Sequence, residues 1–233
     1  MSEIDFKAIY AGQAQAYHRM IAAEDVQGNL LPALQGVAPL AGQRILDLGS
    51  GTGRIPLLLR GIDCTLVAVD LHRAMLREQA VQRTRAGGRW PLVQADMRIL
   101  PFAADEFDLV VAGWAIGHLC GWYPQEWQAQ VRRVLDEMQR VTRPGGHVLI
   151  LETLTTGAER PAPPNAALAA YYAWLEQAWG FRAQVLATDY AFNDVEDAVQ
   201  RTEFFFGSQL AGDIRQKGWQ RLPEWTGCWS RPV

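Results

Sequence analysis

The stretch of sequence that most constrains the fold runs from Arg44 to Ile55 and reads R-I-L-D-L-G-S-G-T-G-R-I. Its apolar start predicts a short buried strand of a parallel sheet, interrupted by the carboxylate of Asp47. Gly49, Gly51 and Gly53 follow and predict a tight turn, after which a helix should begin near Gly53. Such a turn forms a nucleotide cradle, because glycine lets the backbone approach a ligand and the helix N–H groups point at it.

The details of this turn favour a cationic ligand over a dinucleotide. The dinucleotide fingerprint G-x-G-x-x-G needs a third glycine beside the pyrophosphate, at the position where this chain has Arg54. Asp47 also places a carboxylate next to the ligand, and a carboxylate suits an amino or sulfonium group better than a phosphate. For the glycines alone, a turn that binds no ligand is the alternative, because short G-x-G patterns are common.

The segment I-L-D-L-G-S-G-T-G resembles the first motif of the class I S-adenosylmethionine-dependent methyltransferases, which is a hydrophobic run, an acidic residue, one further residue and G-x-G-x-G. The resemblance spans roughly residues 40 to 155. It implies S-adenosylmethionine as the cofactor. It also implies a Rossmann-like, doubly wound α/β fold, whose seven-stranded sheet is parallel except for an antiparallel last strand between strands five and six, with helices on both faces. The cofactor contacts that it implies in this motif are Asp47, Gly49, Ser50, Gly51 and Gly53.

A second acidic residue, Asp70, ends the predicted strand Thr65 to Val69. In a βαβ unit, a carboxylate at this strand end is placed to accept hydrogen bonds from the ribose hydroxyls of a nucleotide. The resemblance implies the same role toward S-adenosylmethionine, with Leu71 packing on the adenine. The alternative is that Asp70 caps the following helix by accepting from its free N–H groups. Its combination with the glycine motif favours the ribose role.

A third acidic residue, Asp96, follows the predicted strand Trp90 to Gln94. A carboxylate at this strand end can accept a hydrogen bond from the adenine amine, and the resemblance implies this role for Asp96, with Met97 beside it. The fourth strand then leads to Trp114, which we expect near the methyl group and count among the cofactor contacts. This strand lacks the D/N-P-P-Y/F motif of the methyltransferases that modify DNA bases or protein glutamine, which makes those substrates less favoured.

His118 and Glu152 are the candidate catalytic bases. Methyl transfer is an in-line displacement for which alignment of donor and acceptor can suffice, but a hydroxyl or protonated amine acceptor benefits from a base. His118 ranks first because imidazole titrates near neutral pH, and Glu152, at the end of the predicted fifth strand, ranks second. The alternative for His118 is a hydrogen-bonded structural residue at a helix start.

The chain divides into three predicted parts: residues 1–40 as an N-terminal helical lid, residues 41–155 as the cofactor-binding core, and residues 156–233 as the substrate side of the same domain. In the lid, residues 2–23 predict one broken or two short helices, with Gly12 as the weak point. Tyr10 and Tyr17 would either face the ligand or only pack. Outside the lid we expect a bend at Pro144-Gly145-Gly146 before strand five and strand six at Phe181 to Tyr190.

Composition excludes several other classes. The 22 Lys and Arg residues show no basic run and the net charge is −3, so we expect no nucleic-acid partner. The three isolated cysteines argue against a disulfide framework and a zinc site, and we expect no metal. The start has no signal-peptide pattern and no long apolar run occurs, so we expect a cytoplasmic protein with no membrane segment. The oligomeric state stays open.

The sequence therefore predicts an S-adenosylmethionine-dependent methyltransferase that acts on a small, apolar or aromatic molecule. Aromatic residues gather after residue 100, on the half that would form the substrate side. The alternatives are an NAD-dependent oxidoreductase and a non-catalytic S-adenosylmethionine-binding protein. The identity of the acceptor, the methylated atom and the pathway stay open.

Overall fold

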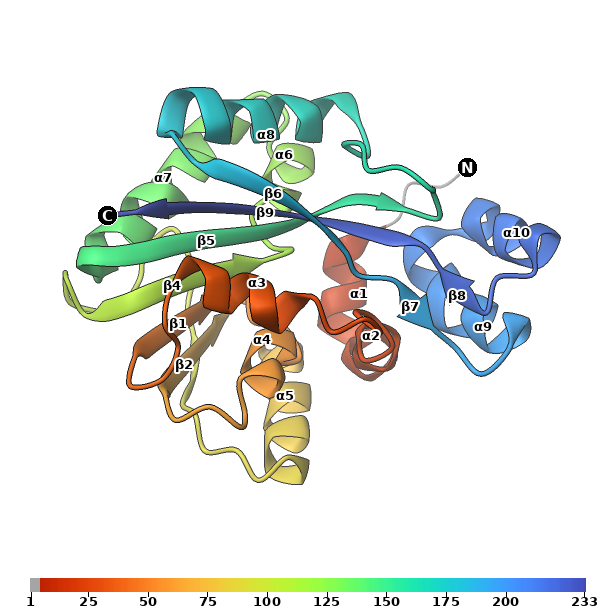
Figure 1. Ribbon diagram of the computed structural model, residues 1–233, viewed down its shortest axis with the longest axis horizontal. Coiled ribbons are helices and arrows are strands. Elements are labelled where there is room, and N and C mark those ends of the chain that lie inside the picture. Colours follow the sequence, from red (N-terminus) through yellow and green to blue (C-terminus); the bar gives the residue numbers. More distant parts are fainter. Residues whose placement is uncertain (1–4) are drawn as a thin grey trace.

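The computed structural model describes residues 5–233 and builds them around a seven-stranded sheet with the strand order β3-β2-β1-β4-β5-β9-β6 (Figure 1). The strands are β1 (Arg44–Leu48), β2 (Thr65–Asp70), β3 (Leu92–Gln94), β4 (Phe107–Gly113), β5 (Thr142–Thr156), β6 (Arg182–Ala187) and β9 (Glu224–Pro232). The first five pair in parallel, whereas β9 runs antiparallel to both β5 and β6. This confirms the predicted sheet, including the antiparallel strand between the fifth and sixth.

Helices cover both faces of this sheet (Figure 1). Side chains of α3 and α4 pack on one face, and side chains of α6, α7 and α8 pack on the other. The helices of these layers are α3 (Leu30–Val37), α4 (Arg54–Leu58), α5 (Arg73–Arg85), α6 (His118–Trp122), α7 (Trp127–Val141) and α8 (Ala166–Trp179). The arrangement is the doubly wound α/β fold that the sequence predicted.

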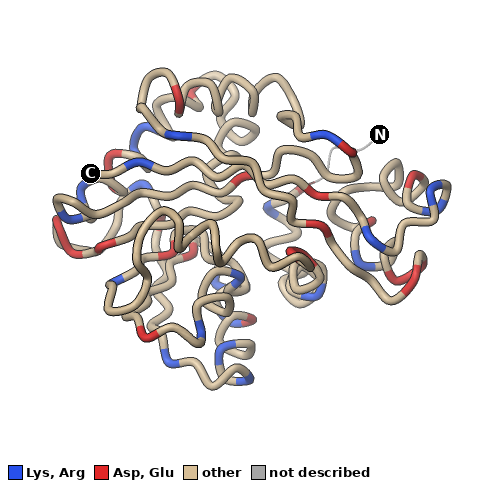
Figure 2. The backbone as a smooth tube through the Cα atoms, viewed as in Figure 1, with Lys and Arg blue, Asp and Glu red and all other residues tan. Residues whose placement is uncertain are grey.

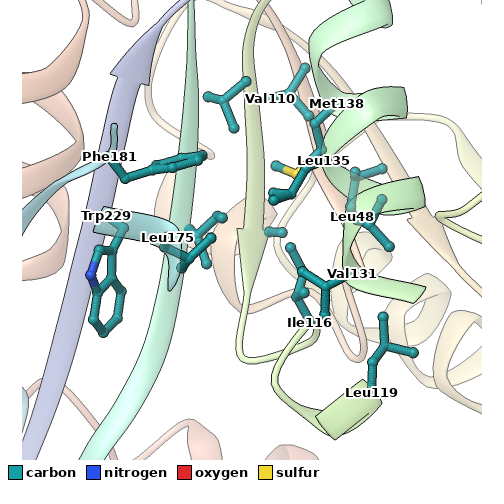
Figure 3. Close-up of a cluster of buried hydrophobic side chains, with 14 of the residues drawn as sticks. Leu48, Val110, Ile116, Leu119, Val131, Leu135, Met138, Leu175, Phe181 and Trp229 are labelled. Carbon is teal, nitrogen blue, oxygen red and sulfur yellow. The ribbon is translucent and has the colours of Figure 1, made fainter. Parts of the chain in front are cut away.

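The two faces of the sheet are held by separate hydrophobic cores, because successive side chains of a strand point to opposite faces. Leu46 and Leu48 of β1 lie in the core under α7, whereas Ile45 lies in the core under α3. Figure 3 shows the first core, where the apolar stripe of α7 meets the strands. The stripe consists of Val131, Val134, Leu135, Met138 and Val141, all fully buried. Full burial of each such side chain contributes about 1.5–3 kcal/mol, so the sheet is a stable platform for the loops at its carboxyl edge.

A second group of helices, built from both ends of the described chain, lies beyond the carboxyl ends of the parallel strands (Figure 1). It contains α1 (Phe6–Gly12), α2 (Ala14–Ile21), α9 (Val195–Phe206), α10 (Ser208–Lys217) and a small sheet of β7 (Tyr190–Ala191) and β8 (Arg221–Leu222). Met20 of α2, Val199 of α9 and Ile214 of α10 share its core. The two short N-terminal helices confirm the prediction for residues 5–23, and its part on residues 2–4 lies outside the described residues.

Predictions of β-structure were wrong in detail at several places. β3 begins at Leu92 rather than Trp90, and β5 continues past Glu152 to Thr156. Phe181 to Tyr190 do not form one strand, because β6 ends at Ala187 and Tyr190 belongs to β7. The chain turns between them, where the Asp189 carboxylate accepts a hydrogen bond from the Glu224 backbone N–H at 3.1 Å. Pro144-Gly145-Gly146 do not precede strand five but lie inside β5. They fall at a shift in the pairing register between β4 and β5, where β5 has extra residues without partners on β4.

Charged residues of both signs are interspersed along the chain, and Figure 2 shows Lys and Arg spread over many elements. Within residues 5–233, no helix has both the length and the apolar character that a membrane crossing needs.

Candidate functional site

The glycine turn after β1, the candidate cofactor cradle, is as tight as the sequence predicted. Gly49 has φ +62° and Gly51 has φ +55°, a left-handed conformation that residues with a Cβ rarely adopt. A Cβ on Gly49 would collide with Ala115, whereas a Cβ on Gly51 would lie 3.8 Å from the ring of Tyr17. Gly49 therefore serves packing against the loop after β4, and Gly51 presents bare backbone toward α2.

Asp47 lies at the base of this cradle with a buried carboxylate. It is 1% exposed, and its Oδ2 atom has no hydrogen-bond partner among the described residues. Burial raises the pKa of Asp47 to about 7, although a hydrogen bond with Ser50 lowers it and nearby Asp70 raises it further. A buried carboxylate oxygen without a partner is costly, so the site suits a ligand that brings a positive charge or a hydrogen-bond donor.

Asp70, at the end of β2, ties two loops together at the same edge. Its Oδ2 accepts a hydrogen bond from the Gly51 backbone N–H at 2.8 Å, and its Oδ1 accepts from the His72 N–H at 2.7 Å. Asp70 thus braces both the glycine turn and the start of α5. Its bond to the His72 N–H is the helix-capping contact that the alternative interpretation predicted. Each carboxylate oxygen can accept a further hydrogen bond, so a ribose contact stays compatible. Leu71 beside it is 49% exposed, as a residue that packs on an adenine would be.

Asp96, at the end of β3, has a partner in its own loop. Arg98 donates from Nε to Asp96 Oδ1 at 2.9 Å and from Nη2 to Asp96 Oδ2 at 2.5 Å. These hydrogen bonds hold the pKa of Asp96 below its ordinary value. Met97 packs half-buried against the core next to it. Arg98 also donates to Gln130 at 2.7 Å, and the sequence analysis missed this arginine because nothing in A-D-M-R shows that its side chain folds back.

Helix α2 lies directly on the cradle, and α1, α2 and the residues just after α2 make three polar contacts with the core. Nδ1 of His18 lies 3.1 Å from Oγ1 of Thr52, and the hydroxyl of Tyr10 lies 2.7 Å from Nε2 of His118. The third contact is an ion pair of 2.7 Å between Arg54 and Glu24, a residue just after α2. With Tyr17 packed over Gly51, the space left at the cradle is about 20 Å³.

A much larger cavity, of about 910 Å³, opens next to the cradle between the N-terminal helices, the end of β5, α8 and α9. Its aromatic lining residues are Phe6, Tyr10, Tyr17, Trp114, Trp122, Tyr172, Tyr190, Phe205 and Phe206, and its charged lining residues are Asp5, Lys7, Glu24, Arg54 and Glu152. Tyr17, Arg54 and Trp114 line both the cavity and the cradle.

Trp114 and Arg54 form the partition between these two spaces. The guanidinium of Arg54 lies 3.6 Å from the centre of the Trp114 ring, which is close enough for a cation–π interaction. Trp114 has φ +53°, a strained conformation for a non-glycine residue that the loop after β4 imposes through a hydrogen bond from the Trp114 N–H to the Leu151 carbonyl. The sequence predicted Trp114 at this edge but not its arginine partner.

His118 and Glu152, the two predicted bases, both line the large cavity. His118 stacks on Trp122 at 5.2 Å, and burial lowers its pKa to about 4. Glu152 is 5% exposed, and its Oε1 accepts a hydrogen bond from the Gly117 N–H at 2.7 Å. Burial raises the pKa of Glu152 to about 8, so Glu152 rather than His118 can gain and lose a proton near neutral pH.

Comparison with known proteins gives the family of this chain. Residues 46–150 match a family described as a methyltransferase domain. The chain is 36% identical over 121 residues to a demethylmenaquinone methyltransferase of Clavibacter sepedonicus. This aligned region covers 52% of this chain and 45% of that protein. It is 30% identical over 199 residues to a ubiquinone/menaquinone biosynthesis C-methyltransferase of Syntrophotalea carbinolica. That aligned region covers 82% of this chain and 75% of the relative. The chain spans about half the length of the first curated relatives that it matches.

Among solved structures, a phosphoethanolamine N-methyltransferase of Haemonchus contortus in complex with S-adenosyl-L-methionine superimposes with a TM-score of 0.58. The superposition covers all of this chain and 61% of that one, at 18% identity, and it therefore supports the fold alone. The sequence matches go further. The chain belongs to the class I S-adenosylmethionine-dependent methyltransferase family, whose cofactor is S-adenosylmethionine.

The residues of the cradle fit this cofactor. The unpaired Oδ2 of buried Asp47 suits its cationic amino group, and the bare backbone at Gly51 allows close approach. The free acceptor capacity of Asp70 and the exposed side chain of Leu71 suit its ribose and adenine. Asp96 fits less simply, because Arg98 already donates to both of its carboxylate oxygens, and an adenine amine would have to bind the same carboxylate beside Arg98.

Proposed function

We propose that this protein transfers the methyl group of S-adenosylmethionine to a small, apolar or aromatic acceptor bound in the large cavity. The observation that carries the proposal is the 910 Å³ cavity with aromatic walls, which meets the cofactor cradle at Arg54 and Trp114. Its volume falls in the range of about 300–1,000 Å³ that small-ligand sites occupy. The two relatives described above are named for menaquinone or ubiquinone biosynthesis, which supports a ring-shaped acceptor.

The protein's contribution to this reaction is mainly alignment and exclusion of water. When bound, S-adenosylmethionine supplies an electrophilic methyl group on a sulfonium. The cradle would hold the cofactor, while the aromatic walls hold the acceptor on the other side of the partition. Orientation of this kind can be equivalent to an effective concentration of about 10⁵ M or more. Residues of α1 and α2 form part of the cavity wall, where they would limit the access of water to the bound cofactor and acceptor.

We further propose that residues 1–40 act as a lid on the core of residues 41–155, and that residues 156–233 complete the acceptor side. The support is the set of contacts by which Tyr10, His18 and Glu24 hold the N-terminal helices on the core. The cradle space of about 20 Å³ under Tyr17 is far below the size of a nucleoside ligand. Admission of the cofactor would therefore require α2 to move.

The test is release of S-adenosylhomocysteine from the purified protein with a panel of acceptors. The panel contains phenols, quinols and amines on one side and tRNA, rRNA and protein on the other. We expect turnover with small molecules. Turnover confined to the macromolecules contradicts the proposal, and binding of S-adenosylmethionine without any turnover favours the non-catalytic alternative. Calorimetric titration with NADH in parallel tests the oxidoreductase alternative, for which we expect no binding.

A further inference from the structure

Glu152 is a buried carboxyl in the cavity wall without a cationic partner. It lies on β5, where its Oε1 accepts the Gly117 backbone N–H at 2.7 Å. Within residues 5–233, no Lys, Arg or His forms an ion pair with Glu152. A carboxylate buried in this way is costly unless a positive charge or a donor compensates it.

The groups that face Glu152 from neighbouring elements do not supply this charge. They are the hydroxyl of Tyr10 on α1, the thiol of Cys120 on α6, and the hydroxyls of Tyr171 and Tyr172 on α8. Burial raises the pKa of each of these groups above its ordinary value, so all four are neutral at physiological pH. The other candidate base, His118, is held neutral by burial and contacts the Tyr10 hydroxyl.

The deep part of the cavity also carries more acid than base. Arg54 is occupied by its ion pair with Glu24 and by the Trp114 ring. Glu224, behind them, is 1% exposed, and its Oε2 has no hydrogen-bond partner among the described residues. Burial raises the pKa of Glu224 well above its ordinary value, so the carboxyls that line this part of the cavity are Glu24, which is already paired with Arg54, and Glu152. Lys7 is exposed, and its ammonium lies over the outer wall, 5.0 Å from the Trp122 ring centre.

We propose that the acceptor is an amine, that its ammonium group pairs with Glu152, and that its nitrogen is the atom methylated; this rests on the proposed function. An unpaired buried carboxyl and aromatic walls are the two features that recognise an organic cation. A neutral hydroxyl could satisfy the hydrogen bond of Glu152 only by leaving the buried carboxyl in its protonated form, whereas an ammonium compensates the charged form. An acidic acceptor would place a second unpaired acidic group beside Glu152.

The proton balance of the step follows from this placement. The Glu152 carboxylate accepts one proton from the ammonium, which frees the nitrogen lone pair. The nitrogen then attacks the methyl carbon, so that the N–C bond forms while the C–S bond breaks and its electron pair stays on sulfur. The product is a methylated ammonium and a neutral thioether, and Glu152 keeps the proton until product leaves. Glu152 is therefore assigned as both the anchor and the general base.

The test uses three probes with the same aromatic ring: 2-phenylethylamine, 2-phenylethanol and 3-phenylpropanoate. Their affinities are measured by calorimetry on the full chain with S-adenosylhomocysteine bound, and their methylation is followed with S-adenosylmethionine. We expect the amine to bind about tenfold to a hundredfold more tightly than the alcohol, the usual size of a charge-assisted contact. Glu152→Gln keeps the acceptor for the Gly117 N–H but removes the charge, and should abolish this preference.

Two controls make the outcome decisive. Glu126→Gln removes the same charge from an exposed position outside the cavity and should keep the preference. Glu152→Asp keeps the charge and should keep part of the preference. If both Glu152 variants fail to fold, the comparison of the three probes on the unaltered protein decides alone. Equal or weaker binding of the amine, or a preference that survives in Glu152→Gln, overturns the inference. Methylation of phenols or quinols without any amine overturns it while the proposed function stands, and turnover confined to macromolecules overturns both.

Discussion

The hydroxyl of Tyr10 lies 2.7 Å from Nε2 of His118, although 108 residues separate them in the chain. This contact connects α1, near the N-terminus, to the start of α6, which follows the carboxyl end of the central strand β4. The same two rings lie in T-shaped contact at 5.3 Å, and Phe6 and Trp122 enclose His118 on other sides. The N-terminal helices are therefore attached to the core next to the cavity where methyl transfer is proposed.

Tyr10→Phe should speed the association of S-adenosylmethionine. The change removes one hydrogen bond that holds α1 on the core, worth about 1 kcal/mol, so the open form should be populated roughly fivefold more. Stopped-flow tryptophan fluorescence measures the association rate. Tyr172→Phe is the matched control, because its hydroxyl bonds the Thr153 carbonyl at 2.7 Å without contacting the lid. Equal rates in all three proteins would argue against a lid held by Tyr10.

Asp70→Ala should weaken the binding of S-adenosylmethionine by about 2–3 kcal/mol, since it removes charge-assisted hydrogen bonds to the ribose. It also removes the brace on the Gly51 N–H, so Asp70→Asn, which keeps an acceptor oxygen, should lose less. Isothermal calorimetry measures both affinities, with Asp63→Ala in the exposed loop before β2 as the control. Unchanged affinity in Asp70→Ala would rule out the ribose assignment.

Gly51→Val should abolish cofactor binding. A β-branched residue is strained at φ +55°, and its side chain would project between the cradle and the Tyr17 ring. Gly87→Val is the control for strain alone, because Gly87 has φ +68° in an exposed turn with nothing within 4 Å of a Cβ. Both variants should lose stability in thermal unfolding, but only Gly51→Val should lose binding. Tight binding by Gly51→Val would place the ligand elsewhere.

Glu152 should make the free energy of unfolding fall as pH rises. Burial raises its pKa from an ordinary value of 4.5 to about 8, so across this window the folded protein keeps a proton that the unfolded chain loses. A group that binds more protons in the folded state stabilises it fully below 4.5 and ceases to do so as pH passes about 8. Asp47, with its pKa raised to about 7, contributes in the same direction.

Denaturant unfolding of the protein and of Glu152→Gln across this pH range measures the effect. The difference in unfolding free energy between the two should change with pH, whereas that between the protein and Glu126→Gln should stay constant, because Glu126 is exposed. Parallel curves for the protein and Glu152→Gln would mean that Glu152 titrates at its ordinary pKa.

The sequence by itself determined the core of the fold and the location of the glycine turn that we propose as the cofactor cradle. Apolar runs that end at the glycine turn, at Asp70 or just before Asp96 specify strands and their carboxyl ends, and parallel strands bring those ends to one edge. This information is local, because a buried strand and a tight glycine turn need particular residue types at adjacent positions. The antiparallel strand β9 followed from the family resemblance, and the structure confirms it.

Only the tertiary structure decided which particular side chains contact one another. The pairing of Tyr10 with His118, of Arg54 with Glu24 and Trp114, and of Asp96 with Arg98 leaves no periodic signal in the chain. The proposed order of the two candidate bases is the reverse of the order expected from sequence, for the same reason. Imidazole has the better intrinsic pKa, but burial lowers that of His118 to about 4 and raises that of Glu152 to about 8. Desolvation depends on every element packed around a group, and residues far apart in sequence supply those elements.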